Sequence, residues 1–362
     1  MTRRVFALVP LAFVCVLGLP AAAESPGADL AEHGHWKRLK ALVEPRAAAN
    51  PNDAEAQWLL SLVRMAFHDV DGALAPAEKA AALDPNNAEY RWQVAQVVGE
   101  QAASAGIFKQ LGLAKRFKRE AEGALALRPS FTDAMIGLIE FYDRAPGIAG
   151  GDKNKAAAML DQVSAVNKVD GCIARVRRLG RQSPLPVAEI EQVWVQAVQA
   201  EPSRYEPHIN LASIYAGGDP PRLELAEKEA LLAKKIDIDR VTPYAMLASI
   251  YATRERWPAL DAELAEAEKQ IPDNLVPYLR AAVSLLKTGK DLPRAERYAR
   301  KYLSQDPEPT SNPPAVAHWR LGLILEKQGR TQDSIAELQT ATRLDPKFEQ
   351  AQKDLKRVKV GS

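Results

Sequence analysis

The segment "AEAQWLLSLVRMAFHDVDGALAPAEKAAALDPNN", residues 54–87, decides the fold because its layout recurs near the other end of the chain. There, "AVAHWRLGLILEKQGRTQDSIAELQTATRLDPKF" occupies residues 315–348. Each segment contains an apolar helical run, a polar turn, a second helical run and a closing Asp-Pro. Proline stops a helix because it lacks the backbone N–H and its ring clashes with the preceding turn. Each segment therefore predicts a pair of helices.

Small residues recur at the eighth position of these units: Ser61 in the first, Ala95 in the unit that begins at 88, and Gly322 in the last. A small side chain at this point lets two antiparallel helices approach each other closely. One amphipathic helix pair cannot bury its apolar face alone, so neighbouring pairs must stack. The pattern predicts one all-α repeat array over most of the chain.

Further copies begin with "YEPHINLASIYAGG" at residue 205, "VTPYAMLASIYATRERW" at 241 and "LVPYLRAAVSLLKTGKD" at 275. These units resemble the tetratricopeptide repeat family, whose repeat is about 34 residues long. The resemblance implies a right-handed superhelical solenoid of antiparallel helix pairs. We count about eight units between residues 54 and 348.

The first residues predict export. A basic "MTRR" is followed by the apolar run "VFALVPLAFVCVLGLP" and by "AAA" at 21–23, which is the order of a secretory signal peptide. We expect cleavage after Ala23, a periplasmic or secreted protein, and no transmembrane segment in the mature chain. Cleavage would remove two arginines and Cys15, so the formal charge would fall from +2 to zero and Cys172 would be the only cysteine. A neutral chain has no overall field for nucleic acid or an anionic membrane.

The helix signals divide the chain into five parts. Unit two runs long, and unit four has arginines at the small-residue position and "SPLP" between its helices, so we expect an irregular junction there. The expected parts are a signal peptide at 1–23, an N-terminal helical cap at 24–53, an N-terminal subarray at 54–183 with extended helices and a Gly-rich loop at 145–152, a C-terminal subarray at 184–348, and a capping helix and tail at 349–362.

The Gly-rich stretch "APGIAGGDKNKA", residues 145–156, invites comparison with a phosphate-binding loop. A P-loop requires G-x-x-x-x-G-K-[ST] between a strand and a helix. Here the glycine spacing differs and the preceding "AMIGLIEFYDRA" is helical. We expect an enlarged turn in which Pro146 ends one helix, the glycines allow positive φ, and Asp152 caps the next helix.

Catalytic and metal-binding patterns are missing from the sequence. It contains no G-x-S-x-G, H-E-x-x-H or dinucleotide-binding motif. The "HGH" at 33–35 lacks a third ligand at suitable spacing, so we expect these histidines on a solvated N-terminal helix. We expect no enzymatic activity, no cofactor and no metal. An enzyme hidden in the irregular segments 98–117 and 145–187 is the alternative.

Two basic runs, "FKQLGLAKRFKRE" and "ARVRRLGR", are typical of solvated helix faces. The alternative is a docking patch for an acidic partner or anionic lipid. Few aromatic residues are interleaved, which argues against stacking on nucleic acid. The candidate patch residues are Lys115, Arg116, Lys118, Arg119, Arg175 and Arg178.

The resemblance also implies a binding groove, because certain positions of each first helix face the concave side of such arrays. Those positions carry tryptophans with amide, hydroxyl and guanidinium neighbours, which suit peptide recognition. The implied function is a non-catalytic scaffold that binds a peptide or helix of another protein, whose identity and oligomeric state stay open. The candidate groove residues are Trp58, Trp92, Gln93, Gln96, Asn210, Ser213, Arg280, Trp319 and Arg320.

Two alternatives concern the tryptophans Trp58, Trp92 and Trp319. A shift of one residue in register would place them in the repeat core. If they are exposed, they could instead serve as platforms for sugars, and the protein would then be a glycan-handling helper in envelope assembly.

Overall fold

The computed structural model describes residues 25–360, and every regular element within that range is helical. The expected signal peptide at 1–23 lies outside the described residues. One short 3-10 helix, η1 (Gly147–Ala149), lies between α7 and α8. In chain order the α-helices are α1 (Pro26–His33), α2 (Trp36–Ala49), α3 (Ala54–Ala66), α4 (Val70–Leu83), α5 (Ala88–Ser104), α6 (Ile107–Leu127), α7 (Thr132–Arg144), α8 (Lys153–Val166), α9 (Lys168–Leu179), α10 (Val187–Ala200), α11 (Tyr205–Gly217), α12 (Leu223–Ile236), α13 (Val241–Thr253), α14 (Trp257–Gln270), α15 (Val276–Thr288), α16 (Leu292–Tyr302), α17 (Pro314–Lys327), α18 (Thr331–Leu344) and α19 (Glu349–Val360).

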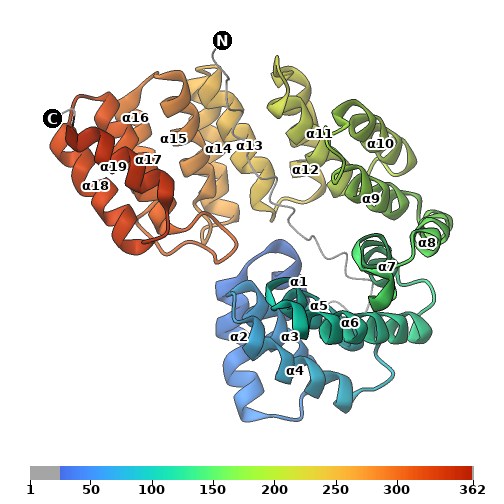
Figure 1. Cartoon of the computed structure of the whole chain (residues 1–362). Helices are drawn as coiled ribbons and strands as arrows, with labels where there is room; N and C mark the ends of the chain where they lie inside the picture. The colour runs from blue at the N-terminus through green and yellow to red at the C-terminus, as the bar shows by residue number, and fades with distance from the viewer. Residues whose placement is uncertain (1–24, 361–362) are drawn as a thin grey trace.

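The helices form consecutive antiparallel pairs, from α3–α4 through α17–α18. Each helix packs on the next one in the chain, and the first helices of several successive pairs also touch, as α13 touches α15. Figure 1 shows the pairs following one another along an arc, with the blue N-terminal helices below the orange and red C-terminal ones. The all-α solenoid and the count of about eight units are confirmed. Helices α1–α2 precede the array and α19 follows it, where caps are expected.

The Asp-Pro turns end one helix and begin the next. In the turn at 84–87, Asp84 is the C-cap of α4 and Asn87 is the N-cap of α5. Asn87 Oδ1 accepts hydrogen bonds from the backbone N–H groups of Glu89 and Tyr90, at 3.0 and 3.2 Å. An N-cap oxygen satisfies N–H groups that have no partner inside the helix. The turn therefore sets where the following unit starts.

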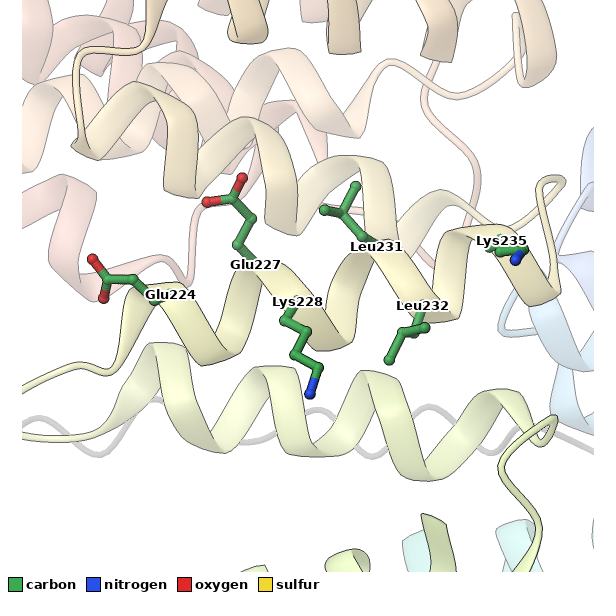
Figure 2. A pocket seen from close by; sticks show the side chains of 6 residues that line it. All are labelled: Glu224, Glu227, Lys228, Leu231, Leu232 and Lys235. Carbon is green, nitrogen blue, oxygen red and sulfur yellow. The ribbon is translucent and has the colours of Figure 1, made fainter. Parts of the chain in front are cut away.

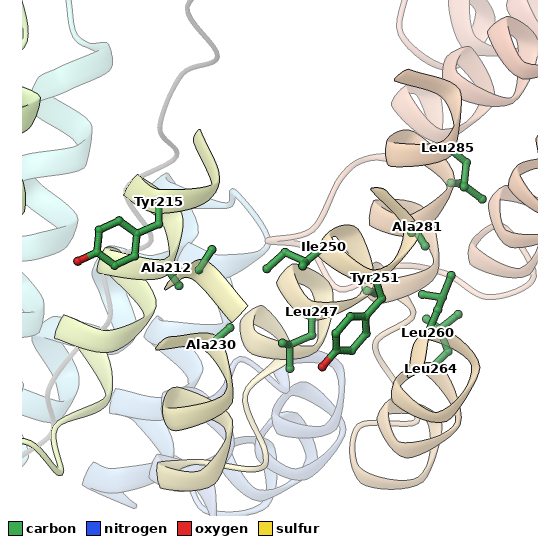
Figure 3. Close-up of a cluster of buried hydrophobic side chains, with 14 of the residues drawn as sticks. Ala212, Tyr215, Ala230, Leu247, Ile250, Tyr251, Leu260, Leu264, Ala281 and Leu285 are labelled. Carbon is green, nitrogen blue, oxygen red and sulfur yellow. The ribbon is translucent and has the colours of Figure 1, made fainter. Parts of the chain in front are cut away.

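The core forms where small residues let helices approach. Ser61 and Ala95 are fully buried, and a Cβ on Gly322 would lie 2.8 Å from Leu338 Cγ on the facing helix. The largest hydrophobic cluster extends from α9 to α17. Figure 3 shows part of this cluster, with leucine, isoleucine, alanine and tyrosine side chains drawn from helices α11 to α15.

The departures from regular repeats are confirmed in part. Unit two has the extended helices α5 and α6, as expected. The division of the array at 183/184 is wrong, because α9 and α10 share the large C-terminal cluster. Val176 and Leu179 of α9 and Ile190 and Trp194 of α10 all belong to it, so the apolar core continues across the "SPLP" turn. The neighbouring cluster ends on α9, at Ala174.

A substitution at Gly137 on α7 tests how closely the second and third repeat units pack. A Cβ at this position would lie 2.3 Å from Trp92 Cη2, a rigid and buried ring atom. Because the ring cannot move aside, we expect Gly137→Ala to lower the free energy of unfolding by about 1–3 kcal/mol, as overpacking does. The measurement is urea denaturation followed by circular dichroism.

The matched control is Gly112→Ala on α6, where an added Cβ would meet nothing within 4 Å. Alanine there should raise the unfolding free energy by up to about 1 kcal/mol, since glycine disfavours helix. Equal effects of the two substitutions would contradict the packing described for Gly137.

Candidate binding surface

Two of the three candidate groove tryptophans lie in the core. The exposed fractions are 7% for Trp58 and 8% for Trp92. Trp58 packs beside Tyr90, and Trp92 contacts the edges of Phe117 and Phe131. The prediction that Trp58 and Trp92 line an open groove is wrong because the following repeat unit covers both rings. The core alternative is the correct one for these two residues, and a buried ring offers no platform to a sugar.

Most of the uncharged polar groove candidates form hydrogen bonds within the chain. Gln93 is buried, and its Nε2 donates a hydrogen bond of 3.0 Å to Ser61 Oγ, so Gln93 is likewise not a groove residue. Gln96 is half-buried. Asn210 donates to the Glu206 carbonyl at 2.7 Å and the exposed Ser213 donates to the carbonyl of Ile209 at 2.9 Å, each within its own helix.

We expect Trp92→Ala to lower the free energy of unfolding by about 3–5 kcal/mol, as removal of a large core side chain does. Chemical denaturation measures this directly. Trp257→Ala is the control, since Trp257 is only partly buried at the edge of the large cluster, and its loss should cost less. A loss of stability below about 1 kcal/mol for Trp92→Ala would show that the ring is not a packing residue.

Trp319 differs from the buried pair because it is only half-buried. Its Nε1 donates a hydrogen bond of 2.8 Å to Asp354 Oδ2 on α19, and its ring meets Phe348 edge-on at 5.2 Å between centroids. The guanidinium carbon of Arg320 lies 4.0 Å from the centre of the Trp319 ring. Trp319 thus fastens α19 to the array and supports Arg320 by a cation–π contact.

Arg280 on α15 and Arg320 on α17 form the candidate site. Within the described part of the chain, neither guanidinium has an acidic residue at ion-pair distance, whereas Arg294, Arg300 and Arg330 nearby are all paired. Burial lowers the pKa of both Arg280 and Arg320, and the positive charge of Arg280 lowers that of Arg320 further. Two like charges therefore lie close enough to interact, and neither forms an ion pair within the described chain.

Protein atoms partly enclose both arginines of the pair. Arg280 reaches solvent, yet protein atoms surround its guanidinium closely enough to desolvate it. Asp354 faces Arg320, but its carboxylate already accepts hydrogen bonds from Trp319 and Arg357, at 2.8 and 3.1 Å. The donors of Arg280 and Arg320 are thus available to an anion from outside the chain.

The basic runs fit the expected solvated helix faces better than the alternative of a docking patch, because acidic side chains neutralise most of the candidate patch residues. Arg178 lies 2.8 Å from Asp143 and Arg175 lies 2.8 Å from Glu189. Ion pairs also join Arg116 to Glu78, Lys118 to Glu122 and Arg119 to Glu120. Only Lys115 among the six candidates is exposed with no ion pair in the described chain. These faces are the solvated, charge-balanced surfaces of ordinary helices.

The Gly-rich loop is an enlarged turn, as expected. Gly150 has a φ of 98°, a conformation that glycine adopts readily. Asp152 Oδ1 accepts hydrogen bonds from the backbone N–H groups of Asn154 and Lys155, at 2.9 and 3.1 Å. These N–H groups open α8, where a phosphate would have to bind. The cap therefore occupies the donors that a phosphate needs.

The expectation of a solvated "HGH" segment is wrong. His35 is 2% exposed and lies 2.9 Å from Asp273, and His33 lies 3.2 Å from Asp237. Both histidines lie at a junction with the C-terminal half of the array. No group of three or more potential ligands among the described residues could hold a metal ion. None of the helices described is long and apolar enough to cross a membrane.

A shallow pocket follows the surface of α12 (Figure 2). All of its lining residues come from this one helix. Glu227 is held by Arg256 at 2.7 Å, and no catalytic pair converges on the space. The lining residues are Glu224, Glu227, Lys228, Leu231, Leu232 and Lys235.

Three solved structures resemble this one at low sequence identity. Yeast Tom70 is 12% identical, with 92% of this chain and 80% of that chain covered and a TM-score of 0.48. A tetratricopeptide repeat protein from Parabacteroides merdae is 13% identical, with 73% of this chain and 98% of that chain covered and a TM-score of 0.45. A chain of the Cut9–Hcn1 hetero-tetramer of the APC/C is 12% identical, with 92% of this chain and 76% of that chain covered and a TM-score of 0.44. The chain matches no protein-family model and no curated protein.

Proposed function

We propose that this chain is a tetratricopeptide-repeat-type scaffold that acts without catalysis and binds a peptide of another protein. The carboxylates of that peptide would bind to Arg280 and Arg320. The observation that carries the proposal is the pair of neighbouring, partly desolvated guanidinium groups that form no ion pair within the described chain. We further propose that the protein acts in the cell envelope, which rests on the signal-peptide pattern at 1–23.

A carboxylate suits this site for geometric and electrostatic reasons. The planar guanidinium presents parallel N–H donors that match the two oxygens of a carboxylate. Arg320 is held in place over the Trp319 ring, so less side-chain freedom is lost when a ligand binds. A negative charge between the two guanidinium groups would also remove their mutual repulsion, which adds to the free energy of binding.

A peptide fits better than a sugar. The glycan hypothesis requires exposed aromatic faces at Trp58, Trp92 and Trp319, but the first two are buried and Arg320 covers a face of the third. The arginine pair lies on α15 and α17, the first helices of consecutive units, which touch each other. An extended segment lying along these helices could place acidic side chains or its terminal carboxylate against both residues.

The test uses fluorescent hexapeptides that end in Asp or Glu, with amidated Asn and Gln versions as neutral probes. We expect the acidic peptides to bind in fluorescence anisotropy, and Arg280→Ala or Arg320→Ala to weaken binding by about 10- to 100-fold, because hydrogen bonds to charged groups are lost. Binding should weaken as salt is added.

Arg297→Ala is the matched control, since Arg297 on α16 is also exposed and no ion pair is found for it within the described chain. This change should leave peptide binding unaltered. The unfolding free energy of Arg280→Ala should equal or exceed that of the unchanged protein, because an uncompensated charge has been removed. Equal binding by acidic and neutral peptides, or equal weakening by all three substitutions, would contradict the proposal.

A further inference from the structure

The N-terminal helices α1 and α2 lie against turns that follow them by more than two hundred residues in the sequence. Three turns take part: α12–α13, α14–α15 and α16–α17. Each joins the second helix of one unit to the first helix of the next, so all three lie along one edge of the array. In Figure 1 the blue helices lie below this part of the arc. The contact closes the solenoid on itself.

The first of these turns is held by α1. Glu32 Oε1 accepts a hydrogen bond of 2.8 Å from Arg240, and His33 Nε2 lies 3.2 Å from Asp237 Oδ2. Arg240 also donates to Asp237 at 2.6 Å. The guanidinium carbon of Arg240 lies 4.7 Å from the centre of the Tyr205 ring. Arg240 is thus anchored to the array and presented to α1.

The second turn is held by His35, which is almost completely buried. His35 Nδ1 lies 2.9 Å from Asp273 Oδ2 with hydrogen-bond geometry. His35 Nε2 lies 3.1 Å from Asp239 Oδ1, which is an ion-pair distance without hydrogen-bond geometry. Arg38 donates to the other oxygen of Asp273 at 2.6 Å. A protonated His35 would thus face two carboxylates.

The third turn is held by α2. The backbone N–H of Lys37 donates to Glu308 Oε2 at 3.1 Å, and Lys37 Nζ donates to the Asp306 carbonyl at 2.5 Å. Glu308 is 1% exposed, and its Oε1 has no hydrogen-bond partner in the described chain. This carboxylate is therefore buried with only part of its hydrogen bonding satisfied.

Apolar packing contributes little to the junction. The hydrophobic cluster that contains the apolar residues of α1 and α2, such as Ala31, Leu39 and Val43, extends only to helices α3 to α5 and Phe67. No hydrophobic cluster among the described residues spans from α1–α2 to the three turns. Hydrogen bonds and ion pairs of the kinds above are therefore the main contacts that hold the closed arrangement.

We propose that α1 and α2 form a detachable clasp, which closes the solenoid while His33 and His35 are protonated and opens when they lose their protons. The two histidines supply positive charge to a set of turns that is rich in aspartate. The charged groups at the junction are Glu32, Lys37 and Arg38 of α1–α2, Asp237, Asp239 and Arg240 of the first turn, Asp273 of the second and Glu308 of the third. Asp29 and Asp306 take part through their backbone carbonyls, which contact His33 and Lys37.

The direction of the pH dependence follows from these pairs. The hydrogen bond to Asp237 raises the pKa of His33 from 6.5 to about 9. Burial disfavours protonation of His35, but its hydrogen bond to Asp273 and the nearby carboxylates outweigh burial and raise its pKa. A pKa raised by closure means that protonation favours closure. The contribution of His33 to the stability of the closed arrangement is complete below about pH 6.5 and is lost as the pH rises through about 9.

The carboxylates act at lower pH. Burial disfavours ionisation of Asp237, yet its hydrogen bonds to His33 and Arg240 lower its pKa to about 2. Ionised Asp237 therefore stabilises the closed arrangement above about pH 3.8, and this stabilisation is lost as the pH falls through about 2. Burial raises the pKa of Glu308 from 4.5 to about 6, so ionisation of Glu308 opposes closure as the pH rises through that value. Closure is thus strongest in mildly acidic solution.

The test measures one distance across the junction. Spin labels are attached to Ala41→Cys on α2 and Gln339→Cys on α18, both exposed positions, in the full chain with its two native cysteines replaced by alanine. Electron–electron resonance at about pH 6 should give one narrow distance distribution. At about pH 10 the distribution should become broader and longer, since His33 is then neutral.

The variant His33→Gln with His35→Gln should give the broad distribution already at about pH 6, because glutamine carries no charge at any pH. His68→Asn is the matched control: it removes an exposed histidine that makes none of the junction contacts given above and should behave as the unchanged chain. Circular dichroism confirms that the repeats remain folded in each sample.

Two outcomes would overturn the proposal. One is a narrow distribution that persists at both pH values and in the double histidine variant, which would show that charge on the histidines does not control closure. The other is a broad distribution in the unchanged chain at about pH 6, which would show that the clasp is open. Neither outcome bears on peptide binding at Arg280 and Arg320, so the two proposals fail independently.

Discussion

The structure depends on the close approach of consecutive helices at positions that carry a small side chain. Gly322 shows the constraint directly, since even a methyl group there would come within 2.8 Å of Leu338. At Gly137 the missing side chain is replaced by the ring of Trp92 from the preceding unit. Because each pair of helices leaves an apolar face that only its neighbour can cover, the fold is additive along the chain. The chemistry of the surface then depends on the polar and charged side chains that this packing leaves outside the core.

Within the array, acidic and basic side chains are paired locally, because each helix pair packs on its neighbours. Side chains one repeat apart meet on neighbouring helices, so Arg178 finds Asp143 and Arg116 finds Glu78 across a single interface. Arg280 and Arg320 are the informative exceptions, because they lie on neighbouring first helices and present the same sign of charge to each other. Arg297, for example, also forms no ion pair in the described chain but is exposed, whereas Arg280 and Arg320 are partly desolvated beside each other. An unpaired couple of this kind points to a ligand that brings the missing charge.

The sequence predicted the helix pairs, the Asp-Pro turns and the Asp152 cap because each depends on residues close together in the chain. It identified Arg280 and Arg320 by their position in the repeat. It failed for Trp58 and Trp92 because burial depends on the next unit, although the glycine at 137 was a usable signal. The ion pairs that neutralise the basic runs were detectable as acidic residues close by in the chain, as Glu122 is to Lys118, or about one repeat away, as Asp143 is from Arg178. The clasp was not detectable, since it arises from the curvature accumulated over the whole array.

The proposed function requires that Arg280 and Arg320 together bind an external carboxylate more strongly than the other arginines do. The most direct measurement follows the Nε–H signals of the arginine side chains by NMR while succinate, a simple dicarboxylate, is added. We expect the signals of Arg280 and Arg320 to shift first and to saturate together, while those of paired arginines such as Arg178 stay in place. Parallel shifts of all exposed arginines, without saturation at this pair, would contradict the proposed function.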